Sequence, residues 1–126
     1  MDWIVQNAQD RGAKKANRIK TSGAFHTAAM AGAQEDLTLL LDQMDISLPE
    51  HVALYSNVTG KPYESVAEMR ALLKRQVVEP VAWEAGMKNL IAMGVTRIYE
   101  TGPGMQLRAM LKRIDTAAYD TASVMQ

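Results

Sequence analysis

The chain has 126 residues, of which 48% are hydrophobic and 22% charged, a composition typical of one small globular domain rather than of a disordered segment. Its 14 basic and 14 acidic side chains balance, so charge gives no reason to expect a nucleic acid or an anionic membrane as ligand. The absence of cysteine excludes disulfides, a thiolate nucleophile and cysteine-based metal sites, and it fits a reducing compartment.

The first third of the chain predicts a helix, a strand and a second helix. Residues 2–11 place apolar side chains on one side of a short helix that Gly12 ends, and they lack the basic-then-apolar layout of a signal or transit peptide. The alternating segment NRIKTS (17–22) predicts a strand. From residue 27 to 44 apolar residues recur every three or four positions, which predicts an amphipathic helix. No apolar run in the chain approaches the ~20 residues of a membrane span.

The middle of the chain predicts a strand followed by two helices. Residues 51–57 (HVALYSN) are typical of a strand. Ser65 and Glu68 form a capping box, in which the serine hydroxyl accepts the free amide three residues on and the glutamate reaches back. Pro80 begins the next helix at a position that needs no amide donor, and Gly94 ends it.

The last part predicts a strand at 95–100, a tight turn and a helix at 106–114, followed by a loose polar tail from 115 to 126. Strands that alternate with helices indicate the α/β class, with a short and mostly parallel sheet flanked by helices. Three short strands make a thin sheet, and parallel strands need cover on both faces. We therefore expect one structural unit that is incomplete.

Two histidines are the candidate acid–base groups. His26 follows a Gly-Ala-Phe turn at a strand–helix junction, where a single histidine is most often structural. As a general base, its imidazole needs a nucleophile within hydrogen-bond reach and a third group on its other nitrogen. The chain contains neither cysteine nor a Gly-x-Ser-x-Gly elbow, so the nucleophile for His26 is not on this chain. His51 lies in a predicted solvated loop, and two histidines alone do not favour a metal site.

A glycine-rich turn and several basic pairs offer weaker signals. Gly102-Pro103-Gly104 lies between a strand and a helix, but its spacing fits neither Gly-x-Gly-x-x-Gly nor a P-loop, and a tight turn is the better interpretation. The basic residues on the predicted helices are read as solvated faces, with contact to an acidic partner as the alternative.

Four segments occur here in a specific order: KTSGAFHTAAM, YSNVTGKPY, LLKRQVVEPVAWEAGM and IYETGPGMQLRAMLKRI. Each alone is a weak signal. Together they closely resemble the C-terminal part of malonyl-CoA:acyl-carrier-protein transacylases, which load malonyl groups in fatty acid synthesis. The resemblance covers roughly residues 3–114.

The resemblance implies a partial α/β-hydrolase-like acyltransferase core. In that family a ferredoxin-like subdomain is inserted into the core, and residues 2–11 resemble the last helix of this subdomain. We expect residues 1–114 to be the incomplete C-terminal segment of an acyltransferase domain and 115–126 to be the loose tail. Sheet edges and an apolar seam should then be exposed, which predicts self-association or a partner chain.

The resemblance also implies the site. By its motif, His26 is the catalytic base that activates a serine, and the main-chain carbonyl of Gln76 orients it. A carbonyl can keep one imidazole nitrogen protonated and leave the other free to accept a proton. Asn57 is expected to line the substrate site. No cofactor and no metal are implied, because the substrates are malonyl-CoA and phosphopantetheinyl acyl carrier protein.

Three family features are missing from the chain: the serine of the Gly-His-Ser-x-Gly elbow, the arginine that pairs with the malonyl carboxylate, and the Gly-Gln-Gly-Ser loop. The chain alone is therefore expected to be inactive. The expected partners are acyl carrier protein and a chain that carries the Gly-His-Ser-x-Gly half, or a second copy of this chain, in the cytoplasm or the mitochondrial matrix. The alternative is a degenerate fragment that serves as a structural or binding subunit of a larger assembly.

Overall fold

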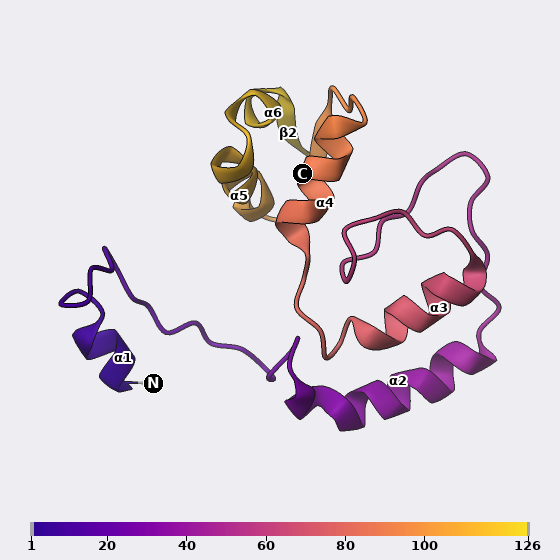
Figure 1. Cartoon of the computed structure of the whole chain (residues 1–126), viewed down its shortest axis with the longest axis horizontal. Coiled ribbons are helices and arrows are strands. Elements are labelled where there is room, and N and C mark those ends of the chain that lie inside the picture. Colours follow the sequence, from indigo (N-terminus) through magenta and orange to yellow (C-terminus); the bar gives the residue numbers. More distant parts are fainter. Residues whose placement is uncertain (1, 126) are drawn as a thin grey trace.

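The computed structural model describes residues 2–125, and its main feature is an open arrangement of three parts (Figure 1). An N-terminal arm projects away from the rest, a pair of helices forms the second part, and a small C-terminal unit forms the third. Within residues 2–125, every helix is too short or too polar to cross a lipid bilayer.

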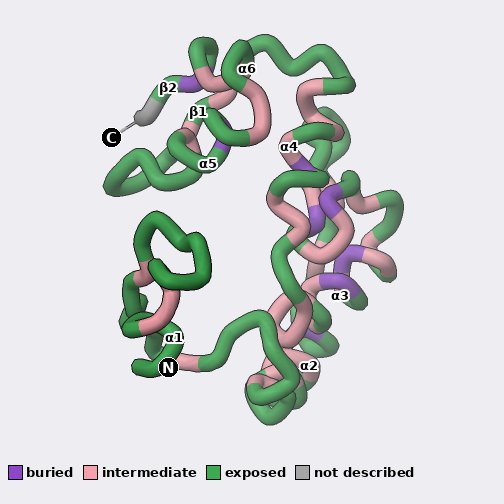
Figure 2. The backbone as a smooth tube through the Cα atoms, turned by 60° about the vertical axis from the view of Figure 1, so that its left-hand side comes forward, coloured by how far each residue is buried: buried purple, intermediate pink, exposed green. Residues whose placement is uncertain are grey.

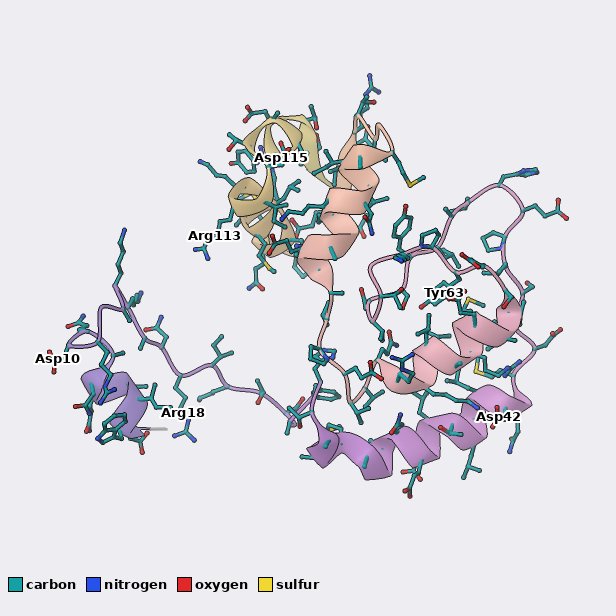
Figure 3. The ribbon with its side chains drawn as sticks, viewed as in Figure 1. Asp10, Arg18, Asp42, Tyr63, Arg113 and Asp115 are labelled. Atoms are coloured by element: carbon teal, nitrogen blue, oxygen red, sulfur yellow. The ribbon has the colours of Figure 1, made fainter. Side chains whose placement is uncertain are left out.

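The N-terminal arm consists of α1 (Asp2–Asn7) and an extended segment. The helix ends before the position predicted for it. The predicted strand at 17–22 is wrong, because these residues form an irregular extended segment. A strand needs a hydrogen-bonded neighbour, and none lies beside this segment in the described part of the chain. Arg18 lies beside α1 (Figure 3), with its Nη1 3.5 Å from Asp2 Oδ1.

The predicted helix at 27–44 is confirmed as a short 3-10 turn, η1 (Ala28–Met30), that continues into α2 (Ala31–Gln43). Thr27 begins it, since its hydroxyl accepts a hydrogen bond from the amide of Ala29 at 3.3 Å. The side-chain cap satisfies an amide that has no partner within the helix.

Two helices, α2 and α3 (Val66–Arg75), pack side by side in the second part (Figure 1). The predicted capping box begins α3: Ser65 Oγ accepts from the amide of Glu68 at 3.1 Å, and the Glu68 carboxylate accepts from the amide of Glu64 at 2.7 Å. At the far end Lys74 Nζ lies 2.6 Å from Oδ1 of Asp42, which Figure 3 labels on α2.

The predicted strand at 51–57 is also wrong. This segment is a loop that makes one isolated antiparallel bridge, between Tyr55 and Pro62. Most of its backbone hydrogen bonds are local, as in the pair formed by Ser56 N and Lys61 O at 2.9 Å, and the carbonyl of Asn57 accepts from the distant amide of Ala82. Its β-type sequence therefore has no neighbouring strand to pair with in the described residues.

The C-terminal unit contains α4 (Trp83–Ala92), β1 (Ile98–Thr101) and α5 (Gln106–Ile114), and the last of these matches the predicted helix at 106–114. The strand predicted at 95–100 begins three residues later. The connection that leaves β1 runs through α5 and α6 (Thr116–Thr121), and it is the helical crossover that two parallel strands require.

Residues 116–125 of the tail that we expected to be loose form a helix and a strand. Helix α6 (Thr116–Thr121) and strand β2 (Ala122–Met125) follow α5, and β2 pairs with β1 in parallel, with Ile98 opposite Ala122. Asp115 begins α6, because its Oδ1 accepts from the amide of Ala118 at 2.8 Å. The sequence analysis missed this aspartate cap.

The buried core is small and divided between the helix pair and the C-terminal unit (Figure 2). Its apolar members are Leu41, Met69, Leu72, Leu111 and Ala122. The accessible surface is 9662 Å². A compact protein of 13.9 kDa exposes only about 6,700 Å², so much of this chain's surface is not covered by its own residues.

The α/β prediction is met in part. The described chain is mostly helical, with one short two-stranded parallel sheet.

Candidate functional site

His26 is joined to the turn that follows α3 by three short contacts. Its amide donates to the carbonyl oxygen of Val77 at 2.8 Å. Its ring nitrogen Nδ1 lies 2.9 Å from the carbonyl oxygen of Gln76 and 3.0 Å from that of Glu79. The structure thus brings together the two residues, His26 and Gln76, that the sequence analysis singled out as base and orienting group.

These contacts determine the tautomer of the imidazole. Both neighbours of Nδ1 are carbonyl oxygens, which only accept hydrogen bonds, so Nδ1 of His26 carries the proton. The neutral ring then has its free electron pair on Nε2, which has no hydrogen-bond partner among residues 2–125. A side chain in this state can take a proton through Nε2 while Nδ1–H stays bound to the carbonyls.

The backbone of His26 adopts an unusual conformation. Its φ of 63° lies in the left-handed region, and no other residue except glycine has a positive φ in the described chain. Histidine is among the side chains that occupy this region more often than average. The three contacts to residues 76–79 hold the backbone there, and they direct the ring at the end of α3.

The turn that holds His26 is closed by a side-chain ion pair. Arg75 Nε lies 2.5 Å from Glu79 Oε1, and Arg75 Nη2 lies 2.9 Å from Glu79 Oε2, so the guanidinium binds the carboxylate in a bidentate manner. The hydrogen bonds from Arg75 and its positive charge lower the pKa of the Glu79 carboxyl below its usual range. The same bond to Glu79 raises the pKa of Arg75.

The lowered pKa of Glu79 predicts a pH dependence of stability. Because the folded-state pKa lies below the ordinary value of about 4.5, the ion pair contributes fully above that pH and is lost as pH falls through the depressed value. We expect the free-energy difference between the wild type and Glu79→Gln to shrink as pH is lowered below 4.5. Denaturant unfolding at a series of pH values measures it. A difference that stays constant down to the acid transition would contradict the expectation.

The loop that carries Asn57 docks on the same connecting segment. The carbonyl of Asn57 accepts from the amide of Ala82 at 2.6 Å, so the segment from Gln76 to Ala82 contacts both candidate residues. The side chain of Asn57 is exposed, and no hydrogen bond joins it to His26 among the described residues. The structure therefore places Asn57 and His26 on one connector without bringing their side chains together.

A close backbone approach holds the Asn57 loop against α4. A side-chain carbon added to Gly60 would lie 2.7 Å from the amide nitrogen of Gly86 and 3.1 Å from the carbonyl of Ala82. The carbonyl of Gly60 also accepts from Asn89 Nδ2 at 2.8 Å. Glycine is needed at position 60 for both space and backbone, since its φ is 65°.

The other sequence features have structural explanations. His51 has a side chain that is 92% exposed, as predicted for a loop histidine. The turn at Gly102-Pro103-Gly104 leads into α5, whose first amides, Leu107 N and Arg108 N, donate to the carboxylate of Glu100 at 3.0 and 2.9 Å. In a phosphate loop, the free amides at the start of the helix bind the phosphate. Here the carboxylate of Glu100 already accepts from these amides, which supports the tight-turn interpretation.

The sequence analysis missed two partners of His26 and the ion pair behind them. The carbonyls of Val77 and Glu79 carry no side-chain signature, so no motif could have indicated them. The Arg75–Glu79 pair was visible in principle, because its i, i+4 spacing is typical of helical ion pairs.

Comparison with known proteins finds several malonyl-CoA-acyl carrier protein transacylases among the relatives. The probable mitochondrial malonyl-CoA-acyl carrier protein transacylase of Drosophila melanogaster is 32% identical over 122 residues, which cover 94% of this chain and 32% of that protein. The crystal structure of the malonyl-CoA:acyl carrier protein transacylase of Xanthomonas oryzae pv. oryzae superimposes with a TM-score of 0.86 at 29% identity, covering 98% of this chain and 38% of that one.

A third relative was solved with its partner. A malonyl-transacylase in complex with its type II polyketide acyl-carrier protein matches with a TM-score of 0.82 at 28% identity, over 98% of this chain and 38% of that chain. No protein-family model matches the chain. The chain spans about a third of the length of these relatives. Over most of its own length, it is homologous to a portion of malonyl-CoA:acyl-carrier-protein transacylases.

Proposed function

We propose that the chain acts as the C-terminal segment of a malonyl-CoA:acyl-carrier-protein transacylase and supplies its catalytic histidine. The observation that carries this proposal is the contact of His26 Nδ1 with the carbonyl of Gln76 at 2.9 Å. It keeps Nδ1 protonated and leaves Nε2 available to a nucleophile, which is the arrangement that a general base requires.

The proposed reaction has two half-reactions that share this base. In the first, Nε2 of His26 takes the proton of a serine hydroxyl, the serine oxygen attacks the thioester carbonyl of malonyl-CoA, and the CoA thiolate leaves with that proton. In the second, the phosphopantetheine thiol gives its proton to Nε2, its sulfur attacks the acyl-serine ester, and the serine oxygen leaves as the alcohol. Nδ1–H donates to the carbonyls of Gln76 and Glu79 throughout, and their oxygens stabilise the transient imidazolium.

The serine belongs to a portion of the enzyme that the chain does not carry, since no Gly-x-Ser-x-Gly occurs in the sequence. We infer that this portion pairs with the β-type segments at 17–22 and 51–57, which have no strand partner within residues 2–125, and completes an α/β-hydrolase-like core with them. In that core the arm at 2–11 belongs to the inserted ferredoxin-like subdomain.

The exposed apolar surface supports such a partner. The accessible surface of 9662 Å² exceeds that of a compact protein of this mass by roughly 3,000 Å². Large apolar side chains contribute to this exposed surface, among them Ile19 at 79% and Val52 at 61% exposure. An excess of this size matches the surface that obligate complexes bury.

Acyl carrier protein is the second proposed partner, and the relative solved with its acyl-carrier protein supports it. The compartment follows from the activity: the cytoplasm of a bacterium or the mitochondrial matrix. We infer that Asn57 lines the substrate site, because its loop docks on the connector that also holds His26. A structural subunit is the competing function, and the small divided core favours it.

Capture and transfer together test the proposal. The tagged chain is co-expressed with its neighbouring reading frames, and captured chains are examined for Gly-His-Ser-x-Gly. The resulting pair, which we call the reconstituted complex, is assayed for malonyl transfer from malonyl-CoA to phosphopantetheinyl acyl carrier protein. We expect transfer by the complex and none by this chain alone. Transfer by neither would identify a structural subunit, and a compact, monodisperse, cooperatively unfolding monomer would count against the need for a partner.

A further inference from the structure

The turn between α3 and α4 spans residues 75–79, and two sets of hydrogen bonds, one from the main chain and one from side chains, join its ends. The amides of Val78 and Glu79 both donate to the carbonyl of Arg75, at 3.1 and 3.0 Å. The side chains of Arg75 and Glu79 close the same span through two hydrogen bonds, at 2.5 and 2.9 Å. Pro80 follows directly, so no further amide is available to hold the end of the turn.

The carbonyls that hold the imidazole lie inside this closed span. Gln76 and Glu79 provide the two oxygens at Nδ1 of His26, and Val77 provides the oxygen for its amide. Glu79 therefore has two separate contacts: its main-chain oxygen binds the ring, while its carboxylate binds Arg75. The contact with Arg75 fixes the end of the Glu79 side chain. It thereby restricts the backbone of Glu79, which sets the direction of the Glu79 carbonyl.

We propose that the Arg75–Glu79 ion pair positions His26, by keeping the carbonyls of the turn directed at Nδ1. This inference rests on the proposed function, because it assigns a role to the pair in the same site. Neither side chain is assigned a contact with substrate, so both are positioning residues. An exposed i, i+4 pair normally adds little to stability, and the role proposed here concerns the geometry of the ring instead.

The chain offers a matched control on the next helix. Glu84 and Lys88 form an i, i+4 pair at 2.5 Å on α4, and the bond to Lys88 lowers the pKa of Glu84, as Arg75 does for Glu79. In the described residues, neither side chain of this pair forms a hydrogen bond or an ion pair with the turn at 76–79. Its removal tests whether loss of a helical ion pair by itself affects His26.

The direct readout is the tautomer of His26, measured by 15N NMR of the imidazoles in the full chain at a pH where the ring is neutral. We expect a dominant Nδ1-protonated form in the wild type. In Arg75→Ala and Glu79→Ala, its ratio to the Nε2-protonated form should fall about threefold or more, as when one hydrogen bond to the ring weakens. Glu79→Gln, which keeps an acceptor for Arg75, should restore most of the ratio, and Glu84→Ala should leave it unchanged.

The outcomes separate this inference from the proposed function. An unchanged tautomer ratio in both Arg75→Ala and Glu79→Ala, with far-ultraviolet circular dichroism like that of the wild type, overturns the positioning role. An equal change in Glu84→Ala also overturns it, since the effect would then be general. If the ratio shifts as expected but the wild-type reconstituted complex transfers no malonyl, the positioning role stands and the proposed function is wrong. His51, whose side chain is 92% exposed and whose Nε2 lies 3.9 Å from Glu50 Oε2, gives the reference signal for a solvent-exposed imidazole without main-chain partners at Nδ1 in the described residues.

Discussion

Replacing His26 by asparagine is expected to lower malonyl transfer by the reconstituted complex about 10²–10⁴-fold, the contribution typical of a general base. Asparagine is chosen because its amide nitrogen can donate to the carbonyls of Gln76 and Glu79 in place of Nδ1, and because it tolerates the left-handed backbone found here. It has no group that can act as Nε2 does. The substitution thus removes the base and keeps the structural contact.

The matched control for this prediction is His51→Asn. His51 is the other histidine, its side chain is 92% exposed, and it should be replaceable without effect on the rate. For both variants, we measure the initial rate of malonyl transfer to phosphopantetheinyl acyl carrier protein. Thermal unfolding of each variant shows whether it is folded. Transfer by His26→Asn within a few-fold of the wild type would show that His26 is a structural histidine at a turn.

Substituting alanine for Gly60 is expected to destabilise the chain by about 2–5 kcal/mol, through backbone strain and overpacking combined. The added carbon would lie 2.7 Å from the amide nitrogen of Gly86, in a part of the loop with a φ of 65°. The clash is with backbone rather than with the end of a flexible side chain, so the loop that carries Asn57 must move away from α4. The free energy of unfolding in denaturant measures the loss.

Gly94→Ala provides the control for this clash. Gly94 also has a left-handed backbone, with a φ of 82°, but an added carbon there meets nothing within 4 Å. Gly94→Ala should lower the free energy of unfolding only through backbone strain, by about 1–2 kcal/mol. Equal losses in the two variants would mean that the contact between Gly60 and Gly86 does not hold the loop.

Local signals in the sequence predicted most helices well. The serine cap at Ser65 and the apolar spacing of 27–44 and 106–114 depend on residues a few positions apart, and the structure has helices there. The strands were predicted less well, since pairing depends on partners far away in the chain or outside it. Residues 17–22 and 51–57 have strand-like sequences but no strand beside them in the described residues.

The candidate site was predicted through a resemblance rather than through spacing. His26 and Gln76 lie 50 positions apart, and no pattern of composition or periodicity relates them. The structure adds the second carbonyl, of Glu79, which sequence motifs could not reveal because main-chain oxygens are common to all residues. It also adds the Arg75 contact with the Glu79 carboxylate, whose i, i+4 spacing was visible in the sequence but did not connect it with His26. The catalytic role of His26 and the substrate contact of Asn57 stay predictions.

Intact-mass analysis after incubation with malonyl-CoA tests most directly the claim that this chain supplies a base and not a nucleophile. We predict no covalent malonyl adduct on this chain, either alone or in the reconstituted complex. In the complex, the adduct should form on the serine of the partner chain, and it should be much reduced when this chain carries His26→Asn. A malonyl adduct on this chain, or an adduct on the partner that forms equally well without it, would contradict the account.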